Sequence, residues 1–170
     1  IDASKFKVYS VEIDKDFKWK YLGHNCSLNF SGELVTQTEI IQIDIAIPCI
    51  HGFPGETGDI QSFFEMIKLP YFGCGPETNI LCFNKLSTKL WLEKHGIKTT
   101  PFHIVSDLTD SEIKKAKDFF ISHQSLFIKA TNQGSSVGCF KCTDEQEIET
   151  LIKEAFKYSP YVILEKEIIG

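Results

Sequence analysis

The sequence predicts an α/β protein built from two modules. Runs of β-branched and aromatic residues alternate along the chain with segments whose apolar residues recur every three or four positions, which is typical of α/β folds. The division between the modules is expected near Gly73–Pro76, which gives residues 1–75 and residues 76–170. Hydrophobic residues make up 42% of the 170 residues, which is enough to build a core.

The first module is expected to open with a β-hairpin. Residues 5–13 alternate like a strand, residues 14–16 supply a polar turn, and residues 17–22 form the returning strand. Residues 24–38 are polar and are expected to be irregular. Residues 40–50 form a nearly continuous β-branched run, the pattern of a strand that is covered on both faces.

Two helical stretches follow. Residues 59–68 predict a helix that Pro70 ends, and its buried face combines Ile60, Phe63, Phe64 and Ile67. A single helical stretch is then expected over residues 76–95, with Gly96 as the residue that terminates it.

The second module continues with four expected strands, at residues 102–105, 126–130, 138–142 and 161–167. Thr109-x-x-Glu112 and Thr143-x-x-Gln146 are capping patterns, each of which is expected to open a helix. The inner face of the second of these helices would carry Ile148, Leu151, Ile152, Ala155 and Phe156.

Composition and charge exclude several classes of protein. The formal net charge is -5 and its charges are interspersed, so the basic footprint of a nucleic-acid-binding protein is absent. No apolar run approaches the roughly 20 residues that span a bilayer, and residues 1–5 do not read as a secretory signal. The chain is therefore expected to be soluble.

The six cysteines are expected to be reduced thiols. Cys49 and Cys82 lie in apolar runs and are interpreted as small core residues. Cys139 and Cys142 have the spacing of a metal or redox pair, but positions three apart on a strand point to opposite faces, and no second pair accompanies them. No metal-ligating residues are therefore predicted.

The segment HGFPGETGDIQ, which begins at His51, follows the predicted strand of residues 40–50 directly. Glycines at 52, 55 and 58 let the backbone approach a ligand, and the helix that follows points its positive N-terminus into the same space. Such a place suits a carboxylate or a phosphate. The alternative is a tight strand-to-helix turn with incidental polar residues.

Lys129 lies on a predicted strand that the loop GSSVG follows. A lysine beside a flexible loop of backbone N–H groups and hydroxyls can clamp nucleotide phosphates, although this is not a Walker loop. The alternative is an ordinary hairpin turn.

Two further candidates are weaker when taken alone. The strand end VILEKEI, with Glu165 and Lys166, could form the rim of an adenine and ribose site, or it could be a common charged strand end. Lys85 and Lys89 lie one helical turn apart, which a solvated helix face also explains.

Together and in this order, these segments resemble the D-alanine–D-alanine ligases of the ATP-grasp superfamily. The matching text is HGFPGETGDIQSFFE, LPYFGCG, FNKLSTK, HGIKTTPF, FIKATNQGSSVGCFK and VILEKEIIG, over roughly residues 43–170. The resemblance implies a Rossmann-like, pre-ATP-grasp α/β module followed by the central ATP-binding subdomain of an ATP-grasp fold.

The resemblance also implies roles for residues that match the motifs. Lys85 and Lys129 would hold the phosphates of ATP, and Ser136 with its loop would cover the transferred phosphoryl group. Ser135 would help to position the first D-alanine, and His51 would lie beside it. The nucleotide base pocket would be lined by Glu165, Lys166 and Ile168. Glu56 is assigned to holding its turn.

Four residues depart from the usual pattern of the family. They are Thr57 in place of Asp, Asn84 in place of Asp, Ala130 in place of Pro, and Glu167 beside the stretch expected to contact adenine.

By the same resemblance, the activity would be ligation of two D-alanines through an acyl phosphate, in the cytoplasm, for peptidoglycan synthesis. The enzyme would be a homodimer that uses ATP with Mg²⁺ or Mn²⁺. The first strand with its Gly-rich loop and the residues that bind magnesium in this family have no match in the chain. We therefore expect the 170 residues to be a fragment that does not catalyse ligation alone.

Two other readings stay open. Another ATP-grasp carboxylate–amine ligase, such as a D-alanine–D-lactate ligase, would share these motifs, and a non-catalytic nucleotide-binding module belongs to a different class. A simple dehydrogenase is disfavoured because no G-x-G-x-x-G follows a first strand.

Overall fold

The computed structural model describes residues 1–169 and opens with the expected hairpin. Strands β1 (Val11–Ile13) and β2 (Trp19–Tyr21) pair antiparallel, and β3 (His24–Asn25) extends this sheet. The first strand is shorter than predicted. Leu22 and Gly23, both with positive φ, end β2 opposite Val11, so within residues 1–169 no strand pairs with the residues before Val11.

A second small sheet occupies the region that was expected to be irregular, so that expectation is wrong. It contains β4 (Ser27–Leu28), β5 (Glu33–Val35) and β6 (Ile40–Gln42), all antiparallel. The Asn29 side chain closes the turn by accepting hydrogen bonds from the backbone N–H groups of Ser31 and Glu33, at 2.9 and 3.0 Å.

The prediction of a strand over residues 40–50 that is covered on both faces is also wrong. Regular pairing ends at Gln42, and a single parallel bridge joins Ala46 to Tyr71. Ile45 and Ile47 are about half exposed, at 51% and 50%. The β-branched pattern is that of a buried strand. Within residues 1–169, however, this segment is not flanked by a neighbouring strand on each of its two edges.

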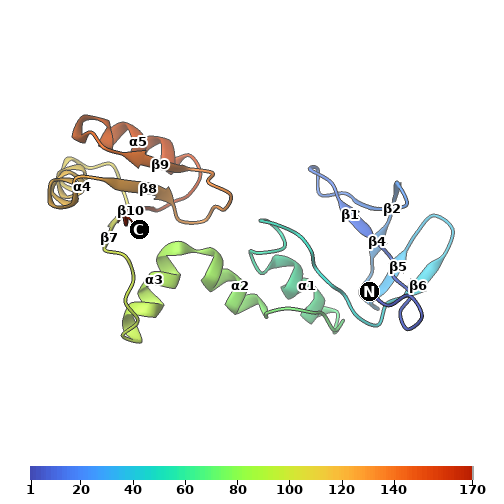
Figure 1. Cartoon of the computed structure of the whole chain (residues 1–170). Helices are drawn as coiled ribbons and strands as arrows, with labels where there is room; N and C mark the ends of the chain where they lie inside the picture. The colour runs from blue at the N-terminus through green and yellow to red at the C-terminus, as the bar shows by residue number, and fades with distance from the viewer. Residues whose placement is uncertain (170) are drawn as a thin grey trace.

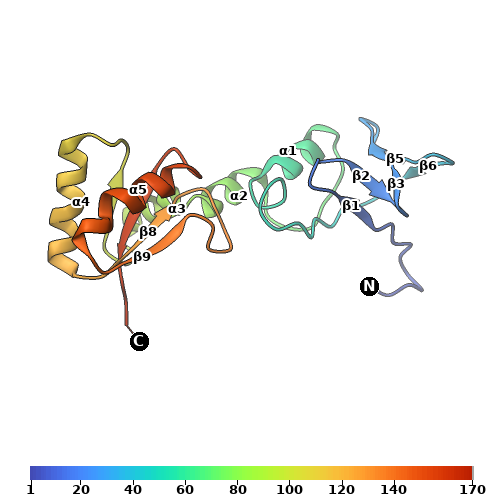
Figure 2. The same cartoon turned by 90° about the horizontal axis from the view of Figure 1, so that it is seen from above.

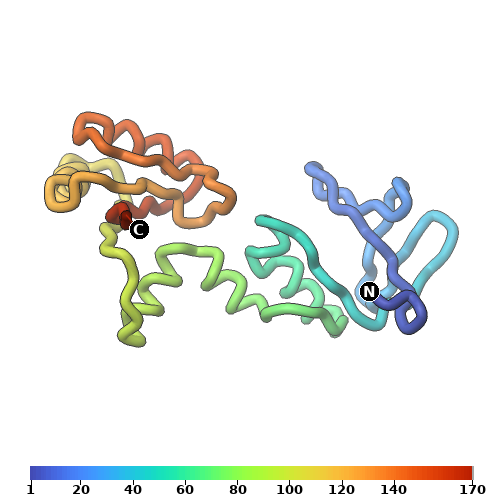
Figure 3. The backbone as a smooth tube through the Cα atoms, in the orientation of Figure 1, coloured from blue at the N-terminus to red at the C-terminus, as the bar shows by residue number. Residues whose placement is uncertain are grey.

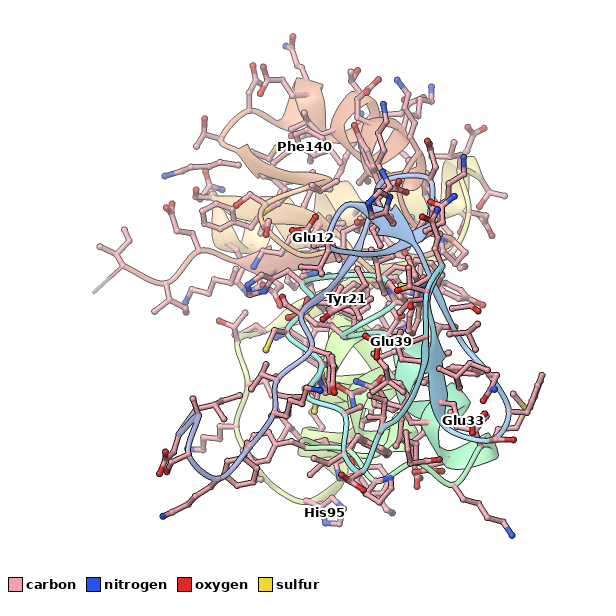
Figure 4. The ribbon with its side chains drawn as sticks, turned by 90° about the vertical axis from the view of Figure 1, so that its right-hand side faces the viewer. Glu12, Tyr21, Glu33, Glu39, His95 and Phe140 are labelled. Atoms are coloured by element: carbon pink, nitrogen blue, oxygen red, sulfur yellow. The ribbon has the colours of Figure 1, made fainter. Side chains whose placement is uncertain are left out.

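Helix α1 (Asp59–Met66) confirms the first predicted helix. Its inner face buries Ile60 and Phe64, which pack with Ile67 and Leu69 in the core of the N-terminal unit. Figure 4 shows the molecule from this end, so that Glu12 and Tyr21 of the hairpin are nearer to the viewer than Phe140.

The single helix expected over residues 76–95 is two helices, α2 (Pro76–Phe83) and α3 (Lys85–Lys94). The break lies at Asn84, whose backbone is extended with ψ of 107° and whose side chain accepts a hydrogen bond from Ser87 N–H. Asn84 is thus an N-cap, a role for which Asn is among the preferred residues. Gly96 adopts positive φ after α3, as predicted.

The C-terminal unit is a four-stranded antiparallel sheet in the order β7-β10-β8-β9. Its strands are β7 (Phe102–Val105), β8 (Leu126–Ala130), β9 (Cys139–Cys142) and β10 (Val162–Lys166). Helices α4 (Asp110–His123) and α5 (Ile148–Phe156) share one hydrophobic core with one face of this sheet. The predicted strands and helices are confirmed here, as Figure 1 shows.

The capping of these two helices differs in one detail from the prediction. Thr109 caps α4 through Glu112 N–H, as expected. Asp144 rather than Thr143 accepts from Gln146 N–H, and a short 3-10 turn, η1 (Glu145–Glu147), precedes α5. A carboxylate one residue later therefore takes the place expected for the threonine hydroxyl.

Period-two alternation divides the sheet into two chemically different faces. Leu126 and Ile128 of β8, with Val162 and Leu164 of β10, point into the core with α4 and α5. The intervening residues of both strands therefore point to the opposite face, along which α3 lies (Figure 1). Seen from above in Figure 2, α3 overlaps the four-stranded sheet and α2 connects it toward α1. The backbone tube in Figure 3 shows the same path of the chain from the side of Figure 1.

The expectation that Cys49 and Cys82 are core residues is wrong, since both are exposed. Cys82 lies on α2, which buries none of its residues, and Cys49 follows the segment that forms no strand. All six cysteines are free thiols, and Cys142 is buried while Cys139 is half-buried. Among residues 1–169, no helix is both long and apolar enough to cross a membrane.

Candidate functional site

The face of the four-stranded sheet that lies toward α3 carries a cluster of charged side chains. Lys129 of β8 and Glu165 of β10 form an ion pair across the two strands. The second carboxylate oxygen of Glu165, Oε1, lies 3.0 Å from Nζ of Lys89 on α3. The side chains of Lys89 and Glu165 are each only 12% exposed, so this pairing takes place largely out of water.

Lys85 joins the cluster from the first turn of α3. Its Nζ donates a hydrogen bond to the carbonyl oxygen of Gln133, and its backbone N–H donates to the carbonyl of Thr131 at 3.0 Å. Burial, followed by repulsion from the nearby Lys129 ammonium, lowers the pKa of Lys85. The attraction of a negatively charged ligand would offset both effects by favouring the charged ammonium.

Glu165 keeps its charge despite its position. Burial opposes ionisation most strongly, but hydrogen bonds and attraction from Lys129 and Lys89 outweigh it, so the pKa of the Glu165 carboxyl lies below its ordinary value. Three ammonium groups therefore face a single carboxylate, which leaves a surplus of positive charge at this place.

The loop between β8 and β9 lies beside the cluster, since Lys85 is bonded to its residue Gln133. Ser135 and Ser136 both adopt positive φ, at 49° and 64°, and both are exposed. The turn is held by backbone bonds from Val137 N–H to the Gly134 carbonyl and from Cys139 N–H to the Ser136 carbonyl. Both serine residues are thus open to solvent on this loop.

The remaining two candidates, at the end of β10 and just after it, do not join the cluster. Lys166 is exposed and donates its backbone N–H to the Pro101 carbonyl at 3.0 Å. Ile168 is 65% exposed. Lys166 follows Glu165 directly, and Ile168 lies two residues further along the chain.

The His51 segment belongs to the other unit. His51 has a side chain that is 98% exposed, with Nδ1 3.9 Å from Oε1 of Glu56. Oε2 of Glu56 accepts a hydrogen bond from Gly52 N–H at 2.7 Å, so this carboxylate bridges the turn. No contact joins His51 to the lysine cluster within residues 1–169.

Lys89 is the residue that sequence reasoning undervalued, because a solvated helix face was the alternative given for it. Its Nζ also donates to the Thr100 carbonyl at 3.1 Å and lies 5.0 Å from the centroid of the Phe102 ring. Its spacing of four residues from Lys85, on the same face of α3, was the available signal.

The departures from the family pattern have local explanations. Asn84 caps α3 as an Asp would, and Thr57 bonds to Asp59 at the start of α1. Ala130 donates its N–H to the Gly138 carbonyl at 2.7 Å, a bond that a proline could not make. Glu167 pairs with Lys141 at 2.6 Å.

Metal-ligating side chains do not cluster in the part of the chain that the structure describes. Over residues 1–169, no three His, Cys, Asp or Glu side chains lie together as a set of ligands. Magnesium therefore stays an expectation from the resemblance, and no chemical step is derived through it.

Comparison with known proteins defines the class first. The crystal structure of D-alanyl-alanine synthetase A from Vibrio cholerae superposes with a TM-score of 0.94 at 43% identity, over 98% of this chain and 50% of that one. The D-alanine–D-alanine ligase from Coxiella burnetii gives 0.90 at 26% identity, over 100% of this chain and 56% of that one. The fold is therefore the α/β fold of the ATP-grasp ligases.

Sequence comparison then gives the family. Residues 1–74 match the D-ala D-ala ligase N-terminus, and residues 91–170 match the D-ala D-ala ligase C-terminus. A D-alanine--D-alanine ligase from Shewanella baltica is 43% identical over 98% of this chain and 50% of its own length. The chain belongs to the D-alanine–D-alanine ligase family, and it spans about half the length of the curated relatives that it matches.

Proposed function

We propose that the protein is an ATP-dependent D-alanine–D-alanine ligase, acting in the cytoplasm for peptidoglycan synthesis. The observation that carries this proposal is the convergence of Lys85 and Lys129, from separate elements, beside the loop that presents Ser135 and Ser136. Triphosphate is the kind of ligand that such a surplus of partly buried positive charge favours.

The cluster suits phosphoryl transfer to a carboxylate. An oxygen of the D-alanine carboxylate attacks the γ-phosphorus of ATP, and ADP leaves. The amine of the second D-alanine then attacks the acyl phosphate carbon, expels phosphate and loses a proton. Lys85 and Lys129 would stabilise charge on the phosphates through both steps without forming a covalent bond.

The other roles are proposed from the matching motifs. Ser136 would cover the transferred phosphoryl group, and Ser135 and His51 would lie at the first D-alanine. The nucleotide base would contact Glu165, Lys166 and Ile168. The proposal further includes Mg²⁺ or Mn²⁺ as the accompanying ion and a homodimer as the assembly.

The test is Lys129→Ala in the full-length protein as its gene encodes it. Loss of a charge-assisted phosphate contact should cost about 1.5–3 kcal/mol, which raises the Kd for ATP by about tenfold or more. Calorimetry gives the Kd, and phosphate release with D-alanine gives the rate of ligation. Lys94→Ala, which removes an exposed lysine from the last turn of α3, is the control.

An ATP affinity for Lys129→Ala within about twofold of wild type, far below that cost, would show that this lysine does not hold the phosphates. Phosphate release measured with D-lactate as the second substrate separates the closest alternative. Nucleotide binding without turnover on any D-amino acid would instead favour a non-catalytic module.

A further inference from the structure

Lys89 occupies a position that phosphate binding alone does not explain. Its ammonium is held by three groups at once, namely the Glu165 carboxylate at 3.0 Å, the Thr100 carbonyl at 3.1 Å and the face of the Phe102 ring. Phe102 is the residue of β7 that pairs with Glu165. Lys89 is therefore fixed to the sheet beside Glu165 and is not directed toward the loop.

Lys129, in contrast, has two competing partners. Its Nζ is bound to Oε2 of Glu165, yet under the proposed function the same ammonium binds the phosphates of ATP. An ammonium that moves to the phosphates gives up part or all of its bond to Glu165. The carboxylate then keeps its charge only if another cation remains beside it, because an unpaired buried charge is costly.

We propose that Lys89 is a positioning residue that keeps the Glu165 carboxylate ionised and oriented when Lys129 turns to the nucleotide phosphates. This inference rests on the proposed function and names a residue that the family resemblance left without a role. Because the Glu165 carboxylate has two lysine partners, Lys129 can bind the ligand while Lys89 keeps Glu165 in place.

The surroundings of Glu165 support this division of roles. The cations that face it are Lys85 and Lys89 from α3 and Lys129 from β8, while β7 contributes the apolar Phe102. Lys85 is bound to the Gln133 carbonyl, on the side of the loop. Lys89 is thus the cation that keeps its contacts with Glu165, Thr100 and Phe102 when a nucleotide binds the other two lysines.

Proton uptake on nucleotide binding tests the proposal. In full-length Lys89→Met, the complex would contain Glu165 without a fixed counter-ion, so the carboxyl should take up a proton when ATP binds. The Kd for ATP should then rise with pH by up to about tenfold per unit relative to wild type, which is the limit for one linked proton. Calorimetry between pH 6 and 9, in buffers of different ionisation enthalpy, measures both quantities.

Two variants separate this effect from a structural one. Lys89→Arg keeps the positive charge and should restore the pH profile of wild type. The double variant Lys89→Met with Glu165→Gln has no carboxyl to protonate and should lose the extra pH dependence. Lys94→Met, in the exposed last turn of the same helix, is the matched control and should behave as wild type.

A folded Lys89→Met variant with the pH profile of wild type would overturn the proposal while leaving the proposed function intact. If that variant does not fold, wild type and Glu165→Gln are compared instead. Equal proton uptake by the two on binding ATP supports the role of Lys89, and greater uptake by wild type contradicts it. A wild-type protein that does not bind ATP would refute both the inference and the proposed function.

Discussion

At the scale of single residues, Glu165 links most of the candidate site, since it is bonded to Lys129 on the neighbouring strand and to Lys89 on α3. Its folded-state pKa lies below the ordinary value near 4.5. A carboxyl with a depressed pKa stabilises the folded state at pH values above its ordinary pKa. That contribution is lost as the pH falls through the folded-state value.

We therefore expect Glu165→Gln to lower the free energy of unfolding at pH 7 by about 1.5–3 kcal/mol, because two largely buried ammonium groups lose their partner. The difference from wild type should shrink as the pH falls below about 4.5, since wild-type Glu165 then becomes neutral as well. Urea unfolding at several pH values measures it. Glu149→Gln, which breaks an exposed pair with Lys153, should change much less. A difference that stays constant down to acidic pH would contradict the expectation.

At the scale of elements, the loop between β8 and β9 depends on the backbone conformation of Gly138. This glycine has φ of +62°, and a Cβ at its position would lie 2.8 Å from Cβ of Ala130 and 3.0 Å from Cδ2 of Tyr158. Gly134, four residues earlier in the same loop, has nothing within 4 Å of such an atom. A side chain is therefore sterically excluded at Gly138 but has room at Gly134.

Gly138→Ala should destabilise the protein by more than about 1 kcal/mol, because the new side chain meets both an unfavourable φ and a close contact. Gly134→Ala should leave the stability nearly unchanged. Thermal unfolding of the two variants side by side measures the contrast, and equal melting temperatures would show that the loop adapts to either residue.

At the scale of the whole molecule, two hydrophobic cores share no residue. One lies around α1, and the other lies between the four-stranded sheet and helices α4 and α5. The division of the chain into residues 1–75 and 76–170 stays a prediction, and these separate cores suggest how to test it.

Ile152→Ala, at a fully buried position of α5, should destabilise the second core by about 2–5 kcal/mol. Hydrogen exchange should then accelerate in β8 and β10 and remain unchanged in α1, where the buried residues belong to the other core. Equal acceleration in both regions would instead show that the two cores unfold as one unit.

The sequence by itself determined those elements whose signals are local. Period-two alternation predicted the bounds of β7, β8 and β10 to within a residue or two. Thr109 predicted the start of α4. The motifs around Lys85, Lys129 and the GSSVG loop were readable as a group. Taken in their order, these motifs resemble those of the D-alanine–D-alanine ligases, and that resemblance indicated the family.

Only the tertiary structure decided what depends on partners distant in sequence. Residues 40–50 have the composition of a buried strand, but strand formation needs hydrogen-bonded neighbours, and regular pairing ends at Gln42. From the sequence, Lys89 resembles a solvated surface lysine. In the structure, α3 lies against the sheet and brings Lys89 beside Glu165. The pairing of charges in three dimensions, which no local pattern encodes, thus determined the chemistry of the site.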